Sequence, residues 1–169
     1  MLRGERLLLR PVTEADIPKL LTEVSDPEVA RWWGDYDEAG LRDELLDDPR
    51  VEALAVELDG EVIGVVEVNE EREPDYRHVG LDIFIAGARH DQGLGREALS
   101  LVIEHLVSER GHHRFTIDPA VENERAIRSY EAVGFTPVGV MKLCERAPDG
   151  TWRDCLFMEL IAGSPAETG

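Results

Sequence analysis

The sequence predicts an α/β protein with a single mixed central sheet of about six or seven strands flanked by helices. Residues 51–58 and 61–69 read as strands around Asp59-Gly60, a pair that favours a tight hairpin turn. Residues 79–86 form an apolar strand that leads through a glycine-bearing turn into a helical pattern. That helix is a crossover, so the strands at 79–86 and 113–117 should be parallel.

The N-terminal quarter of the chain predicts one strand and three short helical segments. Thr13 is the expected cap of the first helix, which continues despite Pro18, and Asp26 before Pro27 opens the second. The third segment is amphipathic. The strand is expected at residues 6–10, and the helices at residues 13–24, 26–34 and 37–46.

Beyond the first hairpin, a charged loop precedes the apolar strand, and Gly134 is the expected C-terminal stop of the last helix. A second hairpin turns at Pro148-Asp149-Gly150. We expect the loop at residues 70–77, the last helix at 124–133, and the two hairpin strands at 138–145 and 152–161. The whole reads as one domain over residues 1–162 with a disordered tail over 163–169.

The charge of the chain is strongly negative and unevenly distributed. The net charge is −18, and residues 1–75 carry 22 acids and 8 bases (−14), whereas residues 76–169 carry 14 acids and 10 bases (−4). Such a surface disfavours nucleic acid and anionic membranes and attracts cations. The N-terminus has no signal-peptide pattern and no segment reaches membrane-spanning length, so a cytoplasmic protein is expected.

The two cysteines, Cys144 and Cys155, have no metal-ligand spacing, and we expect no metal site. A hairpin turning at Asp149-Gly150 would make the two cysteines cross-strand neighbours. In a reducing cytosol, free thiols are the expected state.

The turn from His90 to Gly95 precedes a helix and exposes backbone N–H groups at its N-terminus. Such a turn can bind phosphate without a cationic side chain. It is not a P-loop, because no Lys-Ser/Thr pair follows, and it lacks the three-glycine dinucleotide spacing. Taken alone, the turn is a weak signal, because such turns are more often plain connections between a strand and a helix.

A second motif, Asn123-Glu-Arg-Ala-Ile-Arg-Ser-Tyr-Glu-Ala-Val-Gly-Phe135, follows this turn. The strand, the turn and this segment together resemble the GCN5-related N-acetyltransferase (GNAT) superfamily, which uses acetyl-CoA. The resemblance covers essentially the whole chain. The chain departs from the family pattern at His90, where Arg or Gln is usual, and at Asp91, where Gly is frequent.

Further short motifs resemble the aminoglycoside 6′-N-acetyltransferases within this superfamily. They are Arg31-Trp-Trp-Gly34, Gly80-Leu-Asp82 and Thr116-Ile-Asp-Pro119, with the Asp59-to-Gly64 turn and the opening at residues 10–16. These enzymes acetylate a primary amine of a polycationic antibiotic and so confer resistance. The acidic N-terminal half agrees with a cationic small-molecule substrate.

The resemblance implies a set of site residues. Tyr130 would protonate the leaving thiolate, and Asp82, an acid inside an apolar strand, would bind the amine and act as general base. Asp118 would hold a second ammonium, one of Trp32 and Trp33 would form a wall against a sugar ring, and Glu67 would line the acidic cleft. The cofactor-binding residues would be Ile83, Phe84 and Ile85 for pantetheine, with Gln92, Gly93, Leu94, Gly95, Arg96 and Asn123.

We therefore expect direct acetyl transfer from acetyl-CoA in a ternary complex, by a monomer or homodimer. Two alternatives stay open. One is a GNAT enzyme for another amine, such as a protein N-terminus, a polyamine or a siderophore. The other is a non-catalytic acyl-CoA-binding sensor on the same fold.

Overall fold

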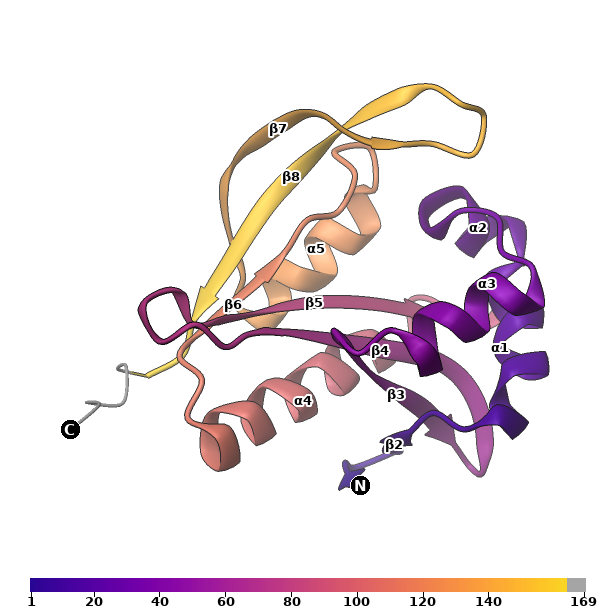
Figure 1. Ribbon diagram of the computed structural model, residues 1–169, viewed down its shortest axis with the longest axis horizontal. Coiled ribbons are helices and arrows are strands. Elements are labelled where there is room, and N and C mark those ends of the chain that lie inside the picture. Colours follow the sequence, from indigo (N-terminus) through magenta and orange to yellow (C-terminus); the bar gives the residue numbers. More distant parts are fainter. Residues whose placement is uncertain (164–169) are drawn as a thin grey trace.

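The computed structural model describes residues 1–163, so all of the predicted tail except Gly163 lies outside the described residues. One mixed sheet of eight strands runs through the molecule in the order β1-β2-β3-β4-β5-β6-β8-β7 (Figure 1). This confirms the predicted fold class, and β1 is the strand beyond the predicted number. The strands are β1 (Leu2–Arg3), β2 (Leu7–Pro11), β3 (Val51–Leu58), β4 (Glu61–Glu71), β5 (His78–Ile85), β6 (Arg114–Ile117), β7 (Thr136–Arg146) and β8 (Trp152–Ile161).

The helices lie close to their predicted positions, with two differences. The first is divided into η1 and α1, because Asp16 accepts from Thr13 N–H to close a capping box and Pro18 then stands in the first turn of α1. The segment at 37–46 is divided into the short α3 and a wider turn, η2. The bounds are η1 (Glu14–Asp16), α1 (Ile17–Val24), α2 (Pro27–Trp33), α3 (Glu38–Arg42), η2 (Asp43–Asp47), η3 (Pro74–Tyr76), η4 (Gly87–Arg89), α4 (Leu94–Arg110) and α5 (Glu124–Val133). Within the described residues, no helix combines the length and the apolar character needed to cross a membrane.

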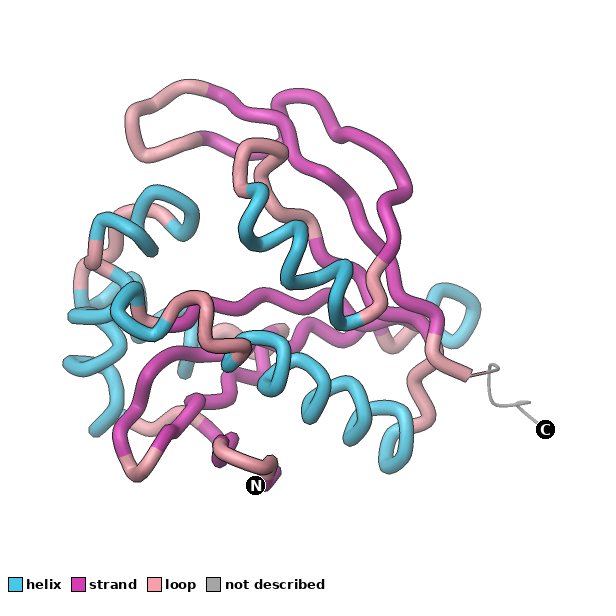
Figure 2. The backbone as a smooth tube through the Cα atoms, turned by 180° about the vertical axis from the view of Figure 1, so that it is seen from behind, coloured by secondary structure: helices cyan, strands magenta, loops and turns pink. Residues whose placement is uncertain are grey.

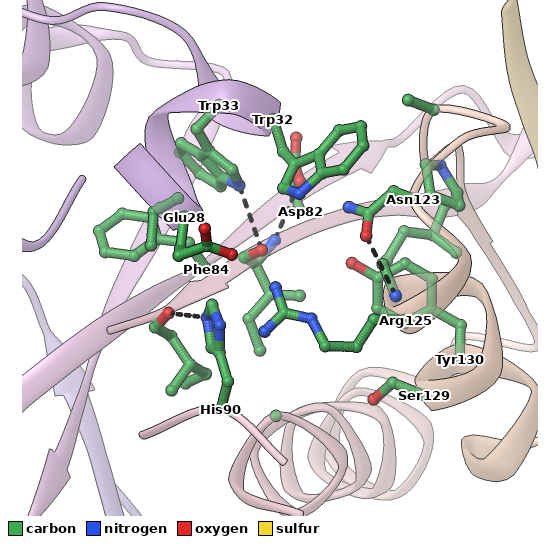
Figure 3. A pocket seen from close by; sticks show the side chains of 18 of the residues that line it. Glu28, Trp32, Trp33, Asp82, Phe84, His90, Asn123, Arg125, Ser129 and Tyr130 are labelled. Carbon is green, nitrogen blue, oxygen red and sulfur yellow. Dashed lines mark hydrogen bonds between the residues drawn. The ribbon is translucent and has the colours of Figure 1, made fainter. Parts of the chain in front are cut away.

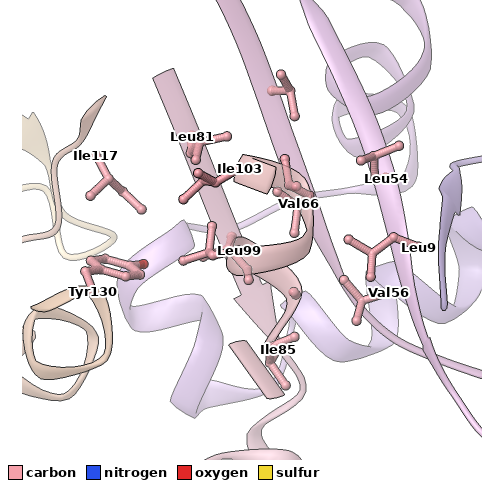
Figure 4. Packing of buried hydrophobic residues seen from close by; sticks show 14 of the residues in the cluster. Leu9, Leu54, Val56, Val66, Leu81, Ile85, Leu99, Ile103, Ile117 and Tyr130 are labelled. Carbon is pink, nitrogen blue, oxygen red and sulfur yellow. The ribbon is translucent and has the colours of Figure 1, made fainter. Parts of the chain in front are cut away.

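Helices cover both faces of the sheet (Figures 1 and 2). On one face, α4 packs with Leu99 and Ile103 against Val66 and Leu81, which forms the larger apolar core (Figure 4). On the other face, α1, α2 and α3 cover a second core that contains Phe84. Alternate residues of β5 therefore serve different cores, as strand geometry requires.

Strands β5 and β6 are parallel, as predicted, but they stay paired only briefly. The register joins Val79 to Phe115 and Gly80 to Thr116, and no further pair follows. Beyond these residues the two strands diverge, and the opening lies between α2 and α5 (Figure 1). This divergence leaves one edge of β5 without a strand partner.

The two cysteines lie across from each other on β7 and β8, as predicted, but the prediction that they are free thiols is wrong. Cys144 and Cys155 form a disulfide with a Cα–Cα distance of 6.0 Å. They are not register partners: Met141 pairs with Cys155 and Glu145 with Arg153. A bulge of three residues, including Leu143 at φ 49°, lies between these pairs and brings the two sulfur atoms together.

Candidate active site

A cleft of about 480 Å³ lies where β5 and β6 diverge (Figure 3). Its walls come from α2, β5, the start of α4, the loop after β6, α5 and Glu145 of β7. It is lined by thirteen of the fifteen residues proposed from the sequence: Trp32, Trp33, Asp82, Ile83, Phe84, Ile85, Gly93, Leu94, Gly95, Arg96, Asp118, Asn123 and Tyr130. Gln92 and Glu67 are not among the lining residues.

One end of the cleft, formed by Gly93–Arg96 and Arg125, is called the basic end here. Gly93 precedes α4 at φ 74°, a left-handed conformation that favours glycine and turns the chain sharply into the helix. The first N–H groups of α4 have no intrahelical acceptor, and Arg96 and Arg125 add positive charge beside them. The backbone cradle and both cations suit a pyrophosphate.

The unpaired edge of β5 forms the floor of the cleft. Trp33 Nε1–H donates to the carbonyl oxygen of Ile83 at 3.2 Å, and His90 Nε2 donates to that of Ile85 at 2.7 Å (Figure 3). His90, which departs from the family pattern, thus folds back on the strand. Each carbonyl keeps a second lone pair with which it can accept from an amide.

Asp82 projects from β5 into the cleft and is opposite Glu67 in the antiparallel register. Its Oδ1 accepts from Ile83 N–H at 3.0 Å, and among residues 1–163 it has no ion-pair partner. Solvent reaches the carboxylate through the cleft, but dense surrounding protein, followed by the charges of Asp118 and Glu44, raises its pKa to about 7. A carboxylate with this pKa can accept a proton at neutral pH.

Tyr130 of α5 is buried at the opposite wall, and its ring meets Phe135 edge to face. Burial and then the charge of Asp82 hold the pKa of its phenol well above the usual range. The phenol therefore keeps its proton at neutral pH. Asn123, which was expected to bind the cofactor, accepts from Ala126 N–H at 3.3 Å and so caps α5 at the cleft.

The other end of the cleft, called the acidic end, is formed by Glu44, Asp82, Asp118 and Glu145. Burial and then the neighbouring charge of Glu145 raise the pKa of Asp118. Of these four carboxyl groups, Glu145 alone has an ion-pair partner among residues 1–163, namely Arg153. Within the described chain, the acidic end therefore lacks the cations that would neutralise it.

The prediction that Glu67 lines the cleft is wrong, because Glu67 is buried beneath it. Glu44 and Tyr36 are the lining residues next to it. Its Oε1 has no hydrogen-bond partner within the described part of the chain, and burial followed by the charge of Glu44 raises the pKa of Glu67 well above the usual range. The side chain faces the same side of the sheet as Asp82, but the covering helices separate it from the opening.

The two tryptophans differ in their surroundings. Trp33 packs edge to face on Phe84 at 4.9 Å between ring centres and so caps the second core. Trp32 has the guanidinium of Arg31 at 4.5 Å and that of Arg153 at 5.3 Å from its ring centre. Trp32 is therefore the tryptophan whose ring lines the cleft without packing into the second core.

Sequence reasoning missed several lining residues. Arg125 lies within the Asn123–Phe135 motif, and its place in the first turn of α5 was a usable signal. Glu44 and Glu145 had no such signal, because each reaches the cleft from a segment distant in sequence. The same is true of Tyr36.

Comparison with known proteins decides the family. The sequence-family model described as 'Acetyltransferase (GNAT) domain' matches residues 6–136 of this chain. The chain belongs to the GNAT family. It is therefore a GNAT N-acetyltransferase, and the strand, turn and helix around the cleft are the parts of the family fold that the sequence motifs indicated.

Two curated relatives of this GNAT protein act on different amines. Aminoglycoside N(6′)-acetyltransferase type 1 of Klebsiella pneumoniae is 28% identical over 168 residues, covering 87% of this chain and 80% of its own. Spermidine N(1)-acetyltransferase of Escherichia coli K12 is 25% identical over 156 residues, covering 89% and 83%. A crystal structure of aminoglycoside acetyltransferase AAC(6′)-Ib with coenzyme A superposes with a TM-score of 0.75 at 25% identity, covering 92% and 94%.

Proposed function

We propose that this protein transfers the acetyl group of acetyl-CoA to a primary amine of a polycationic small molecule, namely a 6′-type amine of an aminoglycoside. The observation that carries the proposal is the pairing of a protonated phenol, Tyr130, with an acidic end whose carboxylates Glu44, Asp82 and Asp118 have no ion-pair partner in the described chain. A cationic amine would supply the missing charge. The similarity to an aminoglycoside 6′-acetyltransferase supports the same choice.

The basic end fits acetyl-CoA. The N–H groups of the first turn of α4 and the Arg96 and Arg125 guanidinium groups would hold the pyrophosphate, and the carbonyls of Ile83 and Ile85 would accept from the pantetheine amides. When bound, acetyl-CoA supplies an acetyl thioester, which needs no acyl-enzyme for transfer to an amine.

Different residues of the cleft would accept the proton of the amine, protonate the leaving sulfur and bind the substrate. Asp82 accepts the proton that the attacking ammonium must lose, because its pKa is near 7. The Tyr130 phenol donates a proton to the departing sulfur and recovers one from the nitrogen, which loses its second proton as the amide forms. Asp118 binds a second ammonium, and Trp32 packs against the ring of the substrate. Attack is direct, with both substrates bound together.

A polyamine is the second candidate, favoured by the similarity to a spermidine acetyltransferase. Spermidine is also polycationic, but its flexible chain has no ring for Trp32 to contact. A non-catalytic acyl-CoA sensor would have no use for a buried phenol opposite an ionisable carboxylate.

The test is to incubate the protein with acetyl-CoA and kanamycin-type aminoglycosides, spermidine or peptides, and to follow release of the CoA thiol. We expect the highest kcat/KM with an aminoglycoside, and mass spectrometry should find the acetyl group on the 6′ nitrogen. Turnover of spermidine alone would move the assignment to polyamines. Tight CoA binding without any turnover would favour the sensor.

A further inference from the structure

The hairpin β7–β8, here called the arm, faces helix α2 across the opening of the cleft (Figures 1 and 2). Arg153 of β8 joins the two. Its Nη1 donates to the carbonyl oxygen of Arg31 at 2.7 Å, and its Nη2 donates to that of Trp32 at 2.9 Å. Among residues 1–163, no other hydrogen bond joins the arm to α2.

The Arg153 side chain is largely buried, and its hydrogen bonds hold it in one position. The side chain is 13% exposed, and its Nε donates to Glu145 of the neighbouring strand. The carbonyls it binds belong to the last turn of α2, where intrahelical donors are missing and a cation is favourable. Its guanidinium also lies near the Trp32 ring.

A disulfide cross-links the two strands of the arm close to Arg153. The Cys144–Cys155 disulfide joins β7 to β8, with Cys144 next to Glu145 and Cys155 two residues beyond Arg153. The other side of β8 is hydrogen-bonded to the loop after β6, through Leu156 N–H and the Pro119 carbonyl at 2.8 Å. The position of Arg153 is therefore set independently of α2.

We propose that Arg153 is a positioning residue that latches α2 to the arm and so fixes Trp32 and Glu145 as facing walls of the amine side of the cleft. This inference rests on the proposed function for its catalytic consequence. Both walls line the cleft, and neither Trp32 nor Glu145 belongs to its basic end. The latch should therefore govern binding of the amine and leave acetyl-CoA binding unchanged.

The test compares Arg153→Met with Arg114→Met. Arg114 is the matched control, because it pairs with Glu159 of the same strand β8 at 3.0 Å, and Glu159 neither belongs to α2 nor lines the cleft. We expect Arg153→Met to raise KM for the best amine substrate roughly tenfold while KM for acetyl-CoA changes by less than about twofold. Arg114→Met should leave both unchanged. Arg153→Lys should rescue only part of the loss, because one ammonium cannot replace the planar fork.

Removing Arg153 also leaves Glu145 without its partner, which adds negative charge to the acidic end. By itself this charge should strengthen the binding of a cationic amine and lower KM, which is the opposite of the effect expected from loss of the latch. A lower KM for the amine in Arg153→Met would therefore show that charge dominates, and it would refute the latch.

Hydrogen exchange gives a readout that does not depend on turnover. Amides of residues 28–33 should exchange faster by about tenfold or more in Arg153→Met and not in Arg114→Met. Unchanged exchange, or an equal rise of both KM values, would overturn the proposal. If the wild-type protein acetylates no amine, the proposed function fails by itself, and exchange still decides on the latch.

Discussion

The basic and acidic ends of the cleft are built in different ways. The basic end consists mainly of backbone N–H groups at one helix terminus, with Arg96 and Arg125 beside them. The acidic end consists of side chains from η2, β5, the loop after β6 and β7. The basic end, built mainly from one continuous segment, suits a ligand that is the same in every reaction. The acidic end is assembled from distant segments, so each of its side chains can be replaced without changing the others.

The largest effect is expected at Asp82, which belongs to the acidic end. Asp82→Asn should lower kcat/KM by roughly a hundredfold or more, because asparagine cannot accept the proton of the ammonium. Steady-state kinetics with the amine measure the loss of activity, and calorimetric titration measures the affinity for acetyl-CoA, which binds at the basic end. CoA affinity should stay the same, and an equal loss of activity and of CoA affinity would show that Asp82 does not belong to the amine side.

The pH dependence follows from the same residue. Since the pKa of Asp82 is raised to about 7, the carboxyl is protonated below that pH and cannot serve as a base. We expect kcat/KM for the amine to fall about tenfold per pH unit below this value and to level off above it. Buffers of constant ionic strength should be used. A profile without this inflection in the wild type would assign the base to another group.

A smaller effect is expected at Tyr130. Tyr130→Phe keeps the ring packed beside Phe135 but removes the proton donor. We expect kcat to fall roughly tenfold to a hundredfold with little change in either KM. An acetyl donor with a more acidic thiol should restore part of the rate, since its thiolate leaves without a proton. Failure of that donor to help would argue against an acid role.

The smallest effect is expected at the basic end. Gly93→Ala places a side chain at φ 74° before α4, which costs about 1 kcal/mol and tilts the N–H groups. KM for acetyl-CoA should rise a few-fold, and KM for the amine should stay constant. Gly60→Ala is the control, because Gly60 also has a positive φ, 82°, but lies in the distant β3–β4 turn. The same KM change in both variants would point to general destabilisation.

Features built from one continuous segment could be predicted from the sequence, whereas features assembled from distant segments could not. Strand β5, its turn and helix α4 are continuous, so their period and glycine spacing were sufficient to find them. Glu67 was misplaced because strand alternation gives its face but says nothing of the helices that cover it. The disulfide depends on a bulge in β7, and a count of residues from the turn assumes a regular ladder.

The contacts of Trp33 and His90 with the carbonyls of Ile83 and Ile85 have a consequence outside catalysis. A strand with an unpaired edge is a template for strands of other molecules. Here an indole and an imidazole each donate to one acceptor along that edge. The protein can therefore keep its sheet open in the middle, where acetyl-CoA would enter, without offering a bare edge for intermolecular aggregation.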